Sequence, residues 1–173
     1  GLLISMQNNI AVLLPYKDQF IKDNAGSASI WVKDFSKESK LKKSTTIFGY
    51  TSNVSKTFDN FKYVNLKFSN FGVQSKNLKY VNKFIDVLNR KKFSLIEIHN
   101  RPSYILHIEK NLPNQKYILV IHNNPQTLRG AVTPKERKHL IKLCSKITFV
   151  SNWVKEKFFE GLDIKNHEKT QVL

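Results

Sequence analysis

The stretches that decide the fold are "SLIEIHN" at residues 94–100 and "YILVIHN" at residues 117–123. Each is a short apolar run that ends in Ile-His-Asn and is followed by one residue and a proline. Apolar runs of this length are typical of strands buried in a parallel sheet, and the proline stops each strand. We therefore expect His99 and His122 to lie at the carboxyl ends of two strands.

Similar apolar runs alternate with helical patterns along the whole chain. Strands are predicted at 9–15, 45–50, 62–68, 94–98, 117–121, 146–150 and 169–173, and helices at 27–43, 77–89, 103–111, 133–144 and 151–162. This alternation implies right-handed crossovers and a mostly parallel sheet with helices on both faces, the α/β doubly wound or Rossmann-like class. Neither a linker nor a true repeat is found, so residues 1–173 are predicted to form a single domain.

Two kinds of local signal define the helices. Thr133 and Glu136 have the spacing of a capping box around Pro134, and Ser151 is placed to cap the next helix. In the helix predicted at 27–43, apolar residues fall on one rough stripe and lysines face away. The stripe comprises Ile30, Trp31, Phe35 and Leu41, and the lysines are Lys33, Lys37 and Lys40.

The composition indicates a globular protein without disulfides. Hydrophobic residues make up 40% of the 173 residues, with only 6 Gly and 5 Pro, which excludes a disordered or collagen-like chain. The single cysteine, Cys144, cannot form an internal disulfide or a cysteine-based zinc site, and its apolar neighbours predict a buried, inert thiol. The apolar runs are too short to span a bilayer and no signal-peptide pattern is found, so a cytoplasmic location is expected.

The charge is strongly positive. With 29 Lys and Arg against 13 Asp and Glu, the formal net charge is +16, which attracts polyanions such as nucleic acid or an anionic membrane. The segments 77–92 and 135–144 are candidates for membrane contact, and lysines interleave with aromatic residues at 60–72, as in some nucleic-acid-binding proteins. A solvated surface that only keeps the protein soluble is the alternative.

Both His-Asn pairs are candidates for one binding site. Ligands of open parallel sheets bind outside the carboxyl ends of the strands, and neighbouring strands lie about 5 Å apart. His99 and Asn100 could therefore line one cleft with His122 and Asn123. The alternative is that each histidine satisfies a local backbone group and each asparagine makes a turn. Two imidazoles without a suitably spaced carboxylate or thiolate are an incomplete metal-ligand set.

Two loops are candidates for contact with an anion or a sugar hydroxyl. The loop "DNAGSAS" contains Asn24, Ala25, Gly26 and Ser27 before a helix N-terminus, although it lacks the three glycines of a dinucleotide fingerprint. A plain turn and cap is the alternative there. The polar connection at 123–134 contains Arg129, which could grip an anion or simply lie in solvent.

In their order along the alternating fold, these motifs resemble the N-terminal domain of GT-B glycosyltransferases, in particular the retaining family four. The resemblance covers nearly the whole chain and rests on the loop at Gly26, "IEIHNRP", "VIHN", "ITFVSNWV" and the terminal "TQVL". It implies one half of a GT-B fold, with a C-terminal donor-binding domain that this chain does not contain.

The resemblance also implies roles for individual residues. Ala25 and Gly26 match the family's Gly-Gly loop, which contacts acceptor or donor phosphate, with alanine in place of the first glycine. His99 matches the histidine beside the reacting sugars, flanked by Asn100 and Arg101. Matches to the second strand end and to the serine that opens a later helix fall at His122, Asn123 and Ser151.

The function that the resemblance implies is transfer of a sugar from a nucleotide diphosphate sugar to a hydroxyl, with retained configuration and no metal or other cofactor. The acceptor is expected to be a glycan or a lipid-linked intermediate, as in lipopolysaccharide or other cell-envelope synthesis, reached by peripheral contact with the inner face of an anionic membrane. The domain is expected to be inactive alone. A basic nucleic-acid-binding module is the alternative interpretation, but no recognised motif in the sequence supports a nucleic-acid partner.

Overall fold

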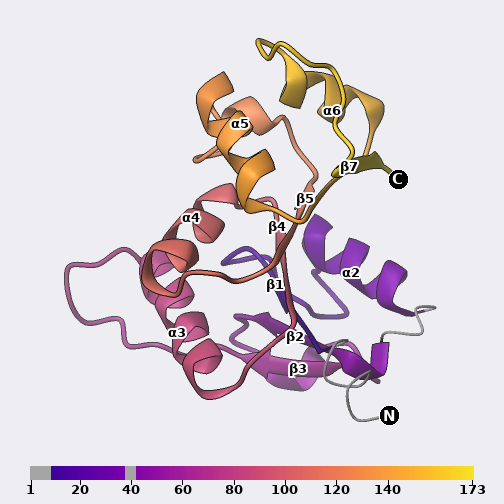
Figure 1. The fold of residues 1–173 in the computed structure, drawn as a ribbon. Helices are drawn as coiled ribbons and strands as arrows, with labels where there is room; N and C mark the ends of the chain where they lie inside the picture. Colours follow the sequence, from indigo (N-terminus) through magenta and orange to yellow (C-terminus); the bar gives the residue numbers. More distant parts are fainter. Residues whose placement is uncertain (1–8, 38–41) are drawn as a thin grey trace, which may run out of the picture. The chain divides into compact units, whose positions relative to one another are not determined.

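The computed structural model describes residues 9–37 and 42–173. Within these residues seven strands alternate with helices, and each strand pairing with a defined register is parallel (Figure 1). This confirms the predicted α/β class with a parallel sheet. Two compact units divide the chain, one up to Leu95 and one from Ile96 to Leu173.

The first unit contains three strands in the order β3-β2-β1 and two α-helices. Its elements are β1 Ile10–Leu13, α2 Ser27–Lys37, β2 Thr45–Gly49, β3 Lys62–Asn65 and α3 Lys76–Arg90. Strand β1 is buried because its run of apolar residues packs between neighbours on both sides of the pleat. The phenol of Tyr80, on α3, donates a hydrogen bond of 2.7 Å to the carbonyl of Leu14, which ties this helix to the end of β1.

The prediction of which residues of α2 face the core is wrong by about one position along the helix. Ala28 and Val32 are buried, whereas Ile30 and Phe35 are about half exposed. The Phe35 ring stacks on Trp31 with their centroids 4.3 Å apart, so part of its surface is covered within the helix itself. Two predicted members of the helix pattern, Lys40 and Leu41, lie outside the described residues, as does the side chain of Lys37.

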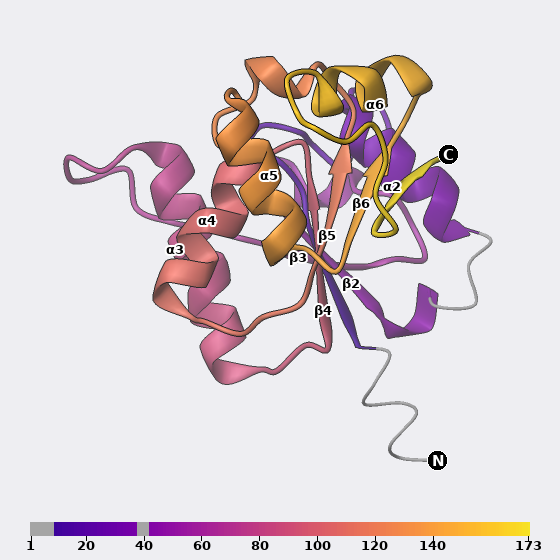
Figure 2. The ribbon, with the colours of Figure 1, turned by 45° about the horizontal axis from the view of Figure 1, so that its top comes forward.

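The second unit contains four parallel strands in the order β4-β5-β6-β7. The first three of them are labelled in Figure 2. Its elements are β4 Leu95–His99, α4 Pro102–Asn111, β5 Tyr117–Ile121, α5 Pro134–Leu143, β6 Lys146–Phe149, α6 Asn152–Phe159 and β7 Thr170–Val172. The register pairs His99 with Val120 and Val120 with Thr148, so the carboxyl ends of β4, β5 and β6 come to the same edge. This edge carries four of the residues predicted to bind a ligand, which are His99, Asn100, His122 and Asn123.

The helix starts follow the predicted capping signals. The Thr133 hydroxyl accepts from the Glu136 amide at 3.1 Å, and the Glu136 carboxylate accepts from the Thr133 amide at 3.0 Å, which completes the capping box. Ser151 accepts a bond from the Val154 amide at the start of α6. Within residues 9–37 and 42–173, three short 3₁₀ turns were not predicted, and they are Lys42–Ser44, Val54–Lys56 and Pro125–Thr127.

Arg137 is the largest fully buried side chain of the described residues, although its basic stretch was predicted to be a solvated or membrane-facing surface. Its guanidinium donates to four backbone carbonyls, those of Ala131, Val132, Phe158 and Glu160, over 2.6–2.9 Å. Burial lowers the pKa of Arg137, and the nearby carboxylates of Glu160 and Glu136 act in the opposite direction. The residue therefore joins α5 to the end of α6.

Two further expectations concern burial and membrane spans. Cys144 is 1% exposed, and burial raises the pKa of its thiol to about 12, as expected for an inert thiol. Among the residues that the structure describes, the helices are all too short or too polar to cross a bilayer.

Replacing Arg137 by methionine should lower the free energy of unfolding by about 3 kcal/mol, because several buried carbonyls lose their charged donor. Urea unfolding followed by circular dichroism measures this loss. The matched control is Lys138→Met, an exposed position on the same helix, which should change stability by less than about 0.5 kcal/mol. Equal effects of the two substitutions would show that Arg137 does not hold α5 and α6 together.

Candidate functional site

The ends of β4 and β5 are joined by the side chain of Asn100. Its carboxamide oxygen accepts from the His122 and Asn123 amides at 3.1 and 3.2 Å, and its nitrogen donates to the Asn123 side chain at 2.8 Å. The backbone of Asn100 has φ +56°, a left-handed conformation that asparagine tolerates better than most residues. The two Ile-His-Asn endings are therefore one hydrogen-bonded unit.

A row of three side chains crosses the same strand ends. The Glu97 carboxylate lies 2.7 Å from Nε2 of His99, and Nδ1 of His99 lies 2.9 Å from Nε2 of His122. Glu97 and His99 share one face of β4 because side chains two residues apart on a strand point to the same side. We call this row the Glu97–His99–His122 chain.

The carboxylate fixes how protons are arranged in this chain. Glu97 accepts from Nε2–H of His99, so a neutral His99 presents Nδ1 as an acceptor and His122 donates to it through Nε2. If His99 carries both protons, the donor and acceptor at the 2.9 Å contact exchange roles. Burial and the neighbouring His99 lower the pKa of His122 to about 3, so His122 is neutral at physiological pH.

His99 and His122 are brought together as predicted, but their exposure differs from the expectation. His99 is fully buried rather than open to a cleft, because Glu97 and His122 cover its two ring nitrogens. His122 is partly exposed, as are Asn100 and Arg101. Of the two rings, His122 is therefore the one accessible from outside.

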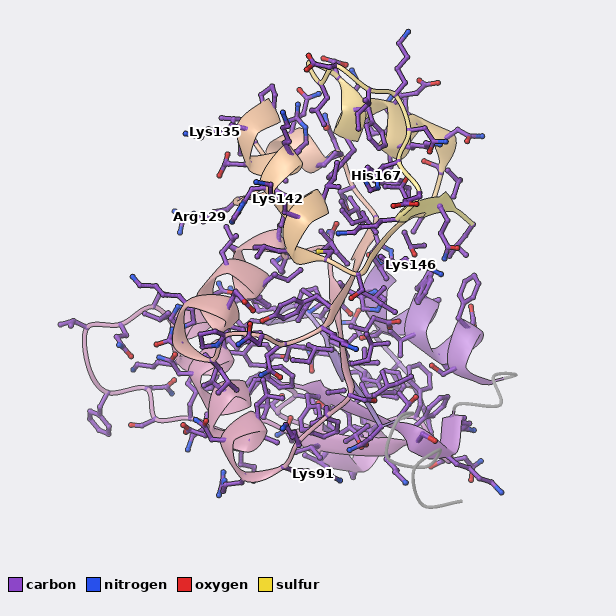
Figure 3. All side chains as sticks on the ribbon, in the orientation of Figure 1. Lys91, Arg129, Lys135, Lys142, Lys146 and His167 are labelled. Atoms are coloured by element: carbon purple, nitrogen blue, oxygen red, sulfur yellow. The ribbon has the colours of Figure 1, made fainter. Side chains whose placement is uncertain are left out.

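The remaining predicted residues of this unit have different surroundings. Arg101 donates through Nη1 to the carbonyl of Asn100 at 2.8 Å, which places its guanidinium at the strand ends. Ser151 also lies at this edge, where its hydroxyl caps α6. Arg129 is exposed and lies at the outer side of α5 (Figure 3). The loop around Arg129 is held by Gly130, whose φ of +93° and close approach to the Ser103 amide leave no room for a side chain.

The loop with Asn24, Ala25, Gly26 and Ser27 belongs to the first unit. The N-terminus of α2, which follows this loop, is bound by a carboxylate of the protein itself. The Asp18 carboxylate accepts from the amides of Ala28 and Ser29 at 3.1 and 3.0 Å and from the Ser29 hydroxyl at 2.5 Å. These amides belong to the first turn of α2, which the sequence analysis considered a candidate for binding an anion such as a phosphate. A Cβ at Gly26 would lie 2.4 Å from the Asp18 carboxyl carbon, so the glycine is needed for this internal contact.

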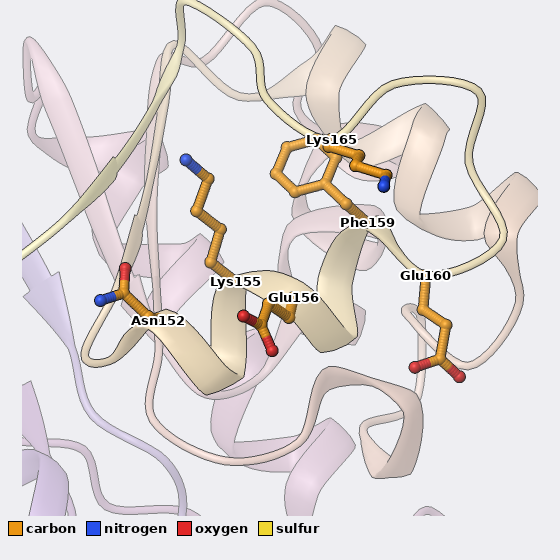
Figure 4. Close-up of a pocket in the computed structure, with 6 residues that line it drawn as sticks. All are labelled: Asn152, Lys155, Glu156, Phe159, Glu160 and Lys165. Carbon is orange, nitrogen blue, oxygen red and sulfur yellow. The ribbon is translucent and has the colours of Figure 1, made fainter.

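A pocket of about 600 Å³ lies along α6 (Figure 4). Its lining consists of Asn152, Lys155, Glu156, Phe159, Glu160 and Lys165. Two lysines and two glutamates balance one another, so the lining has no net charge to attract a phosphate. None of these six residues was predicted to bind a ligand.

Two side chains that contact the candidate residues, Glu97 and Asp18, were not singled out by the sequence analysis. Glu97 stands two residues before His99, and the alternation of a strand would have placed both on one face. The signal was therefore present in "IEIH". Asp18 carried no comparable signal, because its contact with Ser29 spans 11 residues and depends on how the loop folds back.

The architecture of the chain is that of a Rossmann-like α/β domain, and solved structures share it. Anabaena HepE (Alr3699) in complex with UDP and glucose matches with a TM-score of 0.62 and 12% identity over 94% of this chain. The same protein in complex with UDP-glucose matches with a TM-score of 0.57 and 12% identity over 95%. The chain spans only 43% of the length of these structures. The sequence matches no family model and no curated protein.

Replacing His122 by glutamine should flatten the dependence of stability on pH. The pKa of His122 in the folded protein lies below its ordinary value of 6.5. Below pH 6.5, therefore, His122 binds a proton in the unfolded chain but stays neutral in the folded one until the pH approaches 3. The contribution of neutral His122 to the free energy of unfolding is complete above pH 6.5 and is lost as the pH falls toward 3. Between about pH 7 and about pH 5 the parent should lose roughly 1–2 kcal/mol more than His122→Gln, measured by urea unfolding. The exposed control His139→Gln should keep the parental slope, and a parental slope in His122→Gln would contradict the assignment.

Proposed function

We propose that this chain is the acceptor-side domain of a glycosyltransferase that moves a sugar from a nucleotide diphosphate sugar to a hydroxyl group. The observation that carries the proposal is the likeness of 94% of the chain to a structure that contains UDP and glucose. The chain corresponds to 43% of that protein, the share expected for one of two similar halves. The order of the loop, His-Asn and Ser motifs adds independent support from the sequence.

The finer part of the proposal follows the resemblance to family four. In it, the donor sugar is held mainly by a second domain, transfer proceeds with retention and without a metal, and this domain alone is inactive. The acceptor is a glycan or lipid-linked intermediate of the cell envelope. Asn24, Ala25, Gly26 and Ser27 would then contact substrate through side chains or loop backbone, because Asp18 already holds the amides of Ala28 and Ser29.

In this proposal the Glu97–His99–His122 chain positions the acceptor. His122 is partly exposed and meets the acceptor hydroxyl, while the buried His99 acts through it instead of touching the sugar. Glu97 fixes the tautomer of His99 and thereby the proton at Nε2 of His122. In retaining transfer the leaving phosphate takes the acceptor proton, so the Glu97–His99–His122 chain only has to orient the acceptor hydroxyl. Orientation of a reacting group can raise the rate by orders of magnitude. Asn100, Asn123 and Arg101 surround this point.

The test uses the protein that carries this domain together with its donor-binding half. Glu97→Gln keeps the shape of the side chain but removes the charge that orders His99. We expect kcat to fall about 10- to 100-fold with KM for the nucleotide sugar little changed. Acceptor-dependent release of the nucleotide diphosphate measures both constants, and mass spectrometry of the product identifies the sugar transferred.

The matched control is Glu109→Gln, since the Glu109 carboxylate likewise accepts from a ring side chain, in this case the Tyr117 hydroxyl at 3.0 Å. This control should leave kcat within about twofold of the parent. Loss of kcat in both variants would reveal a general structural effect. An unchanged kcat in Glu97→Gln would show that the Glu97–His99–His122 chain has no role in the reaction. Absence of transfer from any nucleotide sugar would contradict the proposed function.

A further inference from the structure

The loop between β3 and α3 presents two apolar side chains to solvent. Phe71 is 90% exposed and Val73 is completely exposed, more than any other large apolar residues of the described chain. Both views show this loop extending away from α3 (Figures 1 and 2). Such exposure is unfavourable, because moving either side chain from water into an apolar environment would lower the free energy.

The loop is held in this form by specific contacts. The Lys79 ammonium, on α3, donates to the carbonyls of Ser69 and Phe71, the first at 3.0 Å. Gly72 has φ +103° and so turns the chain between the two apolar residues. Ser75 then caps α3 by accepting from the Leu78 amide. The loop is thus tied at its base while its tip faces solvent.

The sequence around the tip is rich in lysine, and the first acidic residue after it is Asp86, which lines the same hollow as Phe71. Between Asn60 and Ile85 there is no acidic residue, and the lysines are Lys62, Lys67, Lys76, Lys79 and Lys83. Lys67, Lys76 and Lys83 are exposed. An apolar tip surrounded by exposed cations is complementary to a bilayer interface, where acyl chains lie beneath anionic headgroups.

We propose that residues 69–75 dock this domain on an anionic membrane by inserting Phe71 and Val73 among the lipids, while Lys67, Lys76 and Lys83 contact the headgroup phosphates. The sequence analysis named 77–92 and 135–144 as candidates for membrane contact. The proposal keeps Lys83 from the first segment, and in the second segment Arg137 is buried. It does not rest on the glycosyltransferase proposal, and vesicle binding can succeed or fail whatever reaction the protein catalyses.

The aromatic residues of this region disfavour nucleic acid as the partner. The ring of Tyr63 stacks on Phe20 and the ring of Phe61 packs edge-on against it. Phe68 packs against Tyr16, with centroids 5.7 Å apart. These three rings are partly buried and packed against other rings of the unit, so they form no exposed platform for bases. Val73, beside Phe71 at the tip, offers no stacking surface.

The experiment is sedimentation of the 173-residue chain with vesicles of phosphatidylcholine containing phosphatidylglycerol, at about 0.1 M salt, where charges interact over roughly 10 Å. Pure phosphatidylcholine vesicles are the neutral control. Phe71→Ser with Val73→Ser should weaken binding at least about tenfold by removing the inserted side chains. Lys67→Gln, Lys76→Gln and Lys83→Gln together should weaken it roughly 100-fold, since each lysine contributes about fivefold.

Two matched controls separate the loop from the rest of the surface. Ile30→Ser with Phe35→Ser removes an aliphatic and an aromatic side chain that are also exposed in this unit, and should leave binding within about threefold. Lys135→Gln, Lys138→Gln and Lys142→Gln remove the same charge from α5 and should also leave most binding intact. Circular dichroism verifies that every variant is folded.

A direct probe of insertion is Phe71→Trp. Its fluorescence should shift to shorter wavelength on the anionic vesicles and be quenched by lipids brominated on their acyl chains, relative to the parent with its own tryptophans. Parental binding in both loop variants would overturn the proposal, as would loss of binding only in the α5 variant. Binding of a single-stranded oligonucleotide that the Phe71→Ser and Val73→Ser double variant loses, without binding to vesicles, would also overturn it in favour of nucleic acid.

Discussion

The Asn100 carboxamide is the constraint on which the candidate site depends. By accepting from two consecutive amides after β5, it fixes where that strand ends relative to β4. The parallel register alone would bring the strand ends to one edge but would not set the direction in which each chain leaves the sheet. With that direction set, the rings of His99 and His122 meet at hydrogen-bonding distance. The repeated Ile-His-Asn ending is thus explained by mutual contact and not by duplication of a larger unit.

The fold could be read from the sequence because its signals are local. The strands at β1, β4 and β5 are short apolar runs with clear ends, and the Thr133–Glu136 box defines its helix within four residues. The stripe of α2 failed because Ile30 and Phe35 were assumed to need burial, whereas apolar side chains are common on protein surfaces. Helical periodicity in a short, mixed segment does not decide which face packs.

The site was only partly predictable, for a different physical reason. The meeting of His99 and His122 followed from strand position, but the burial of His99 depends on Glu97 and on packing around it. At the Gly26 loop, the sequence showed a helix N-terminus but not the carboxylate of Asp18 that folds back onto it. A favourable place for an anion is evident from local sequence, whereas its occupant is a tertiary property.

The burial of Cys144 has a practical consequence for following this protein in solution. It is the only thiol in the 173 residues, and its closed surroundings and raised pKa leave little thiolate to react with a maleimide. A cysteine introduced at any exposed position would therefore be the single reactive handle on an otherwise native chain. Spin labels or fluorophores could be attached one site at a time, without first removing a natural residue from the core.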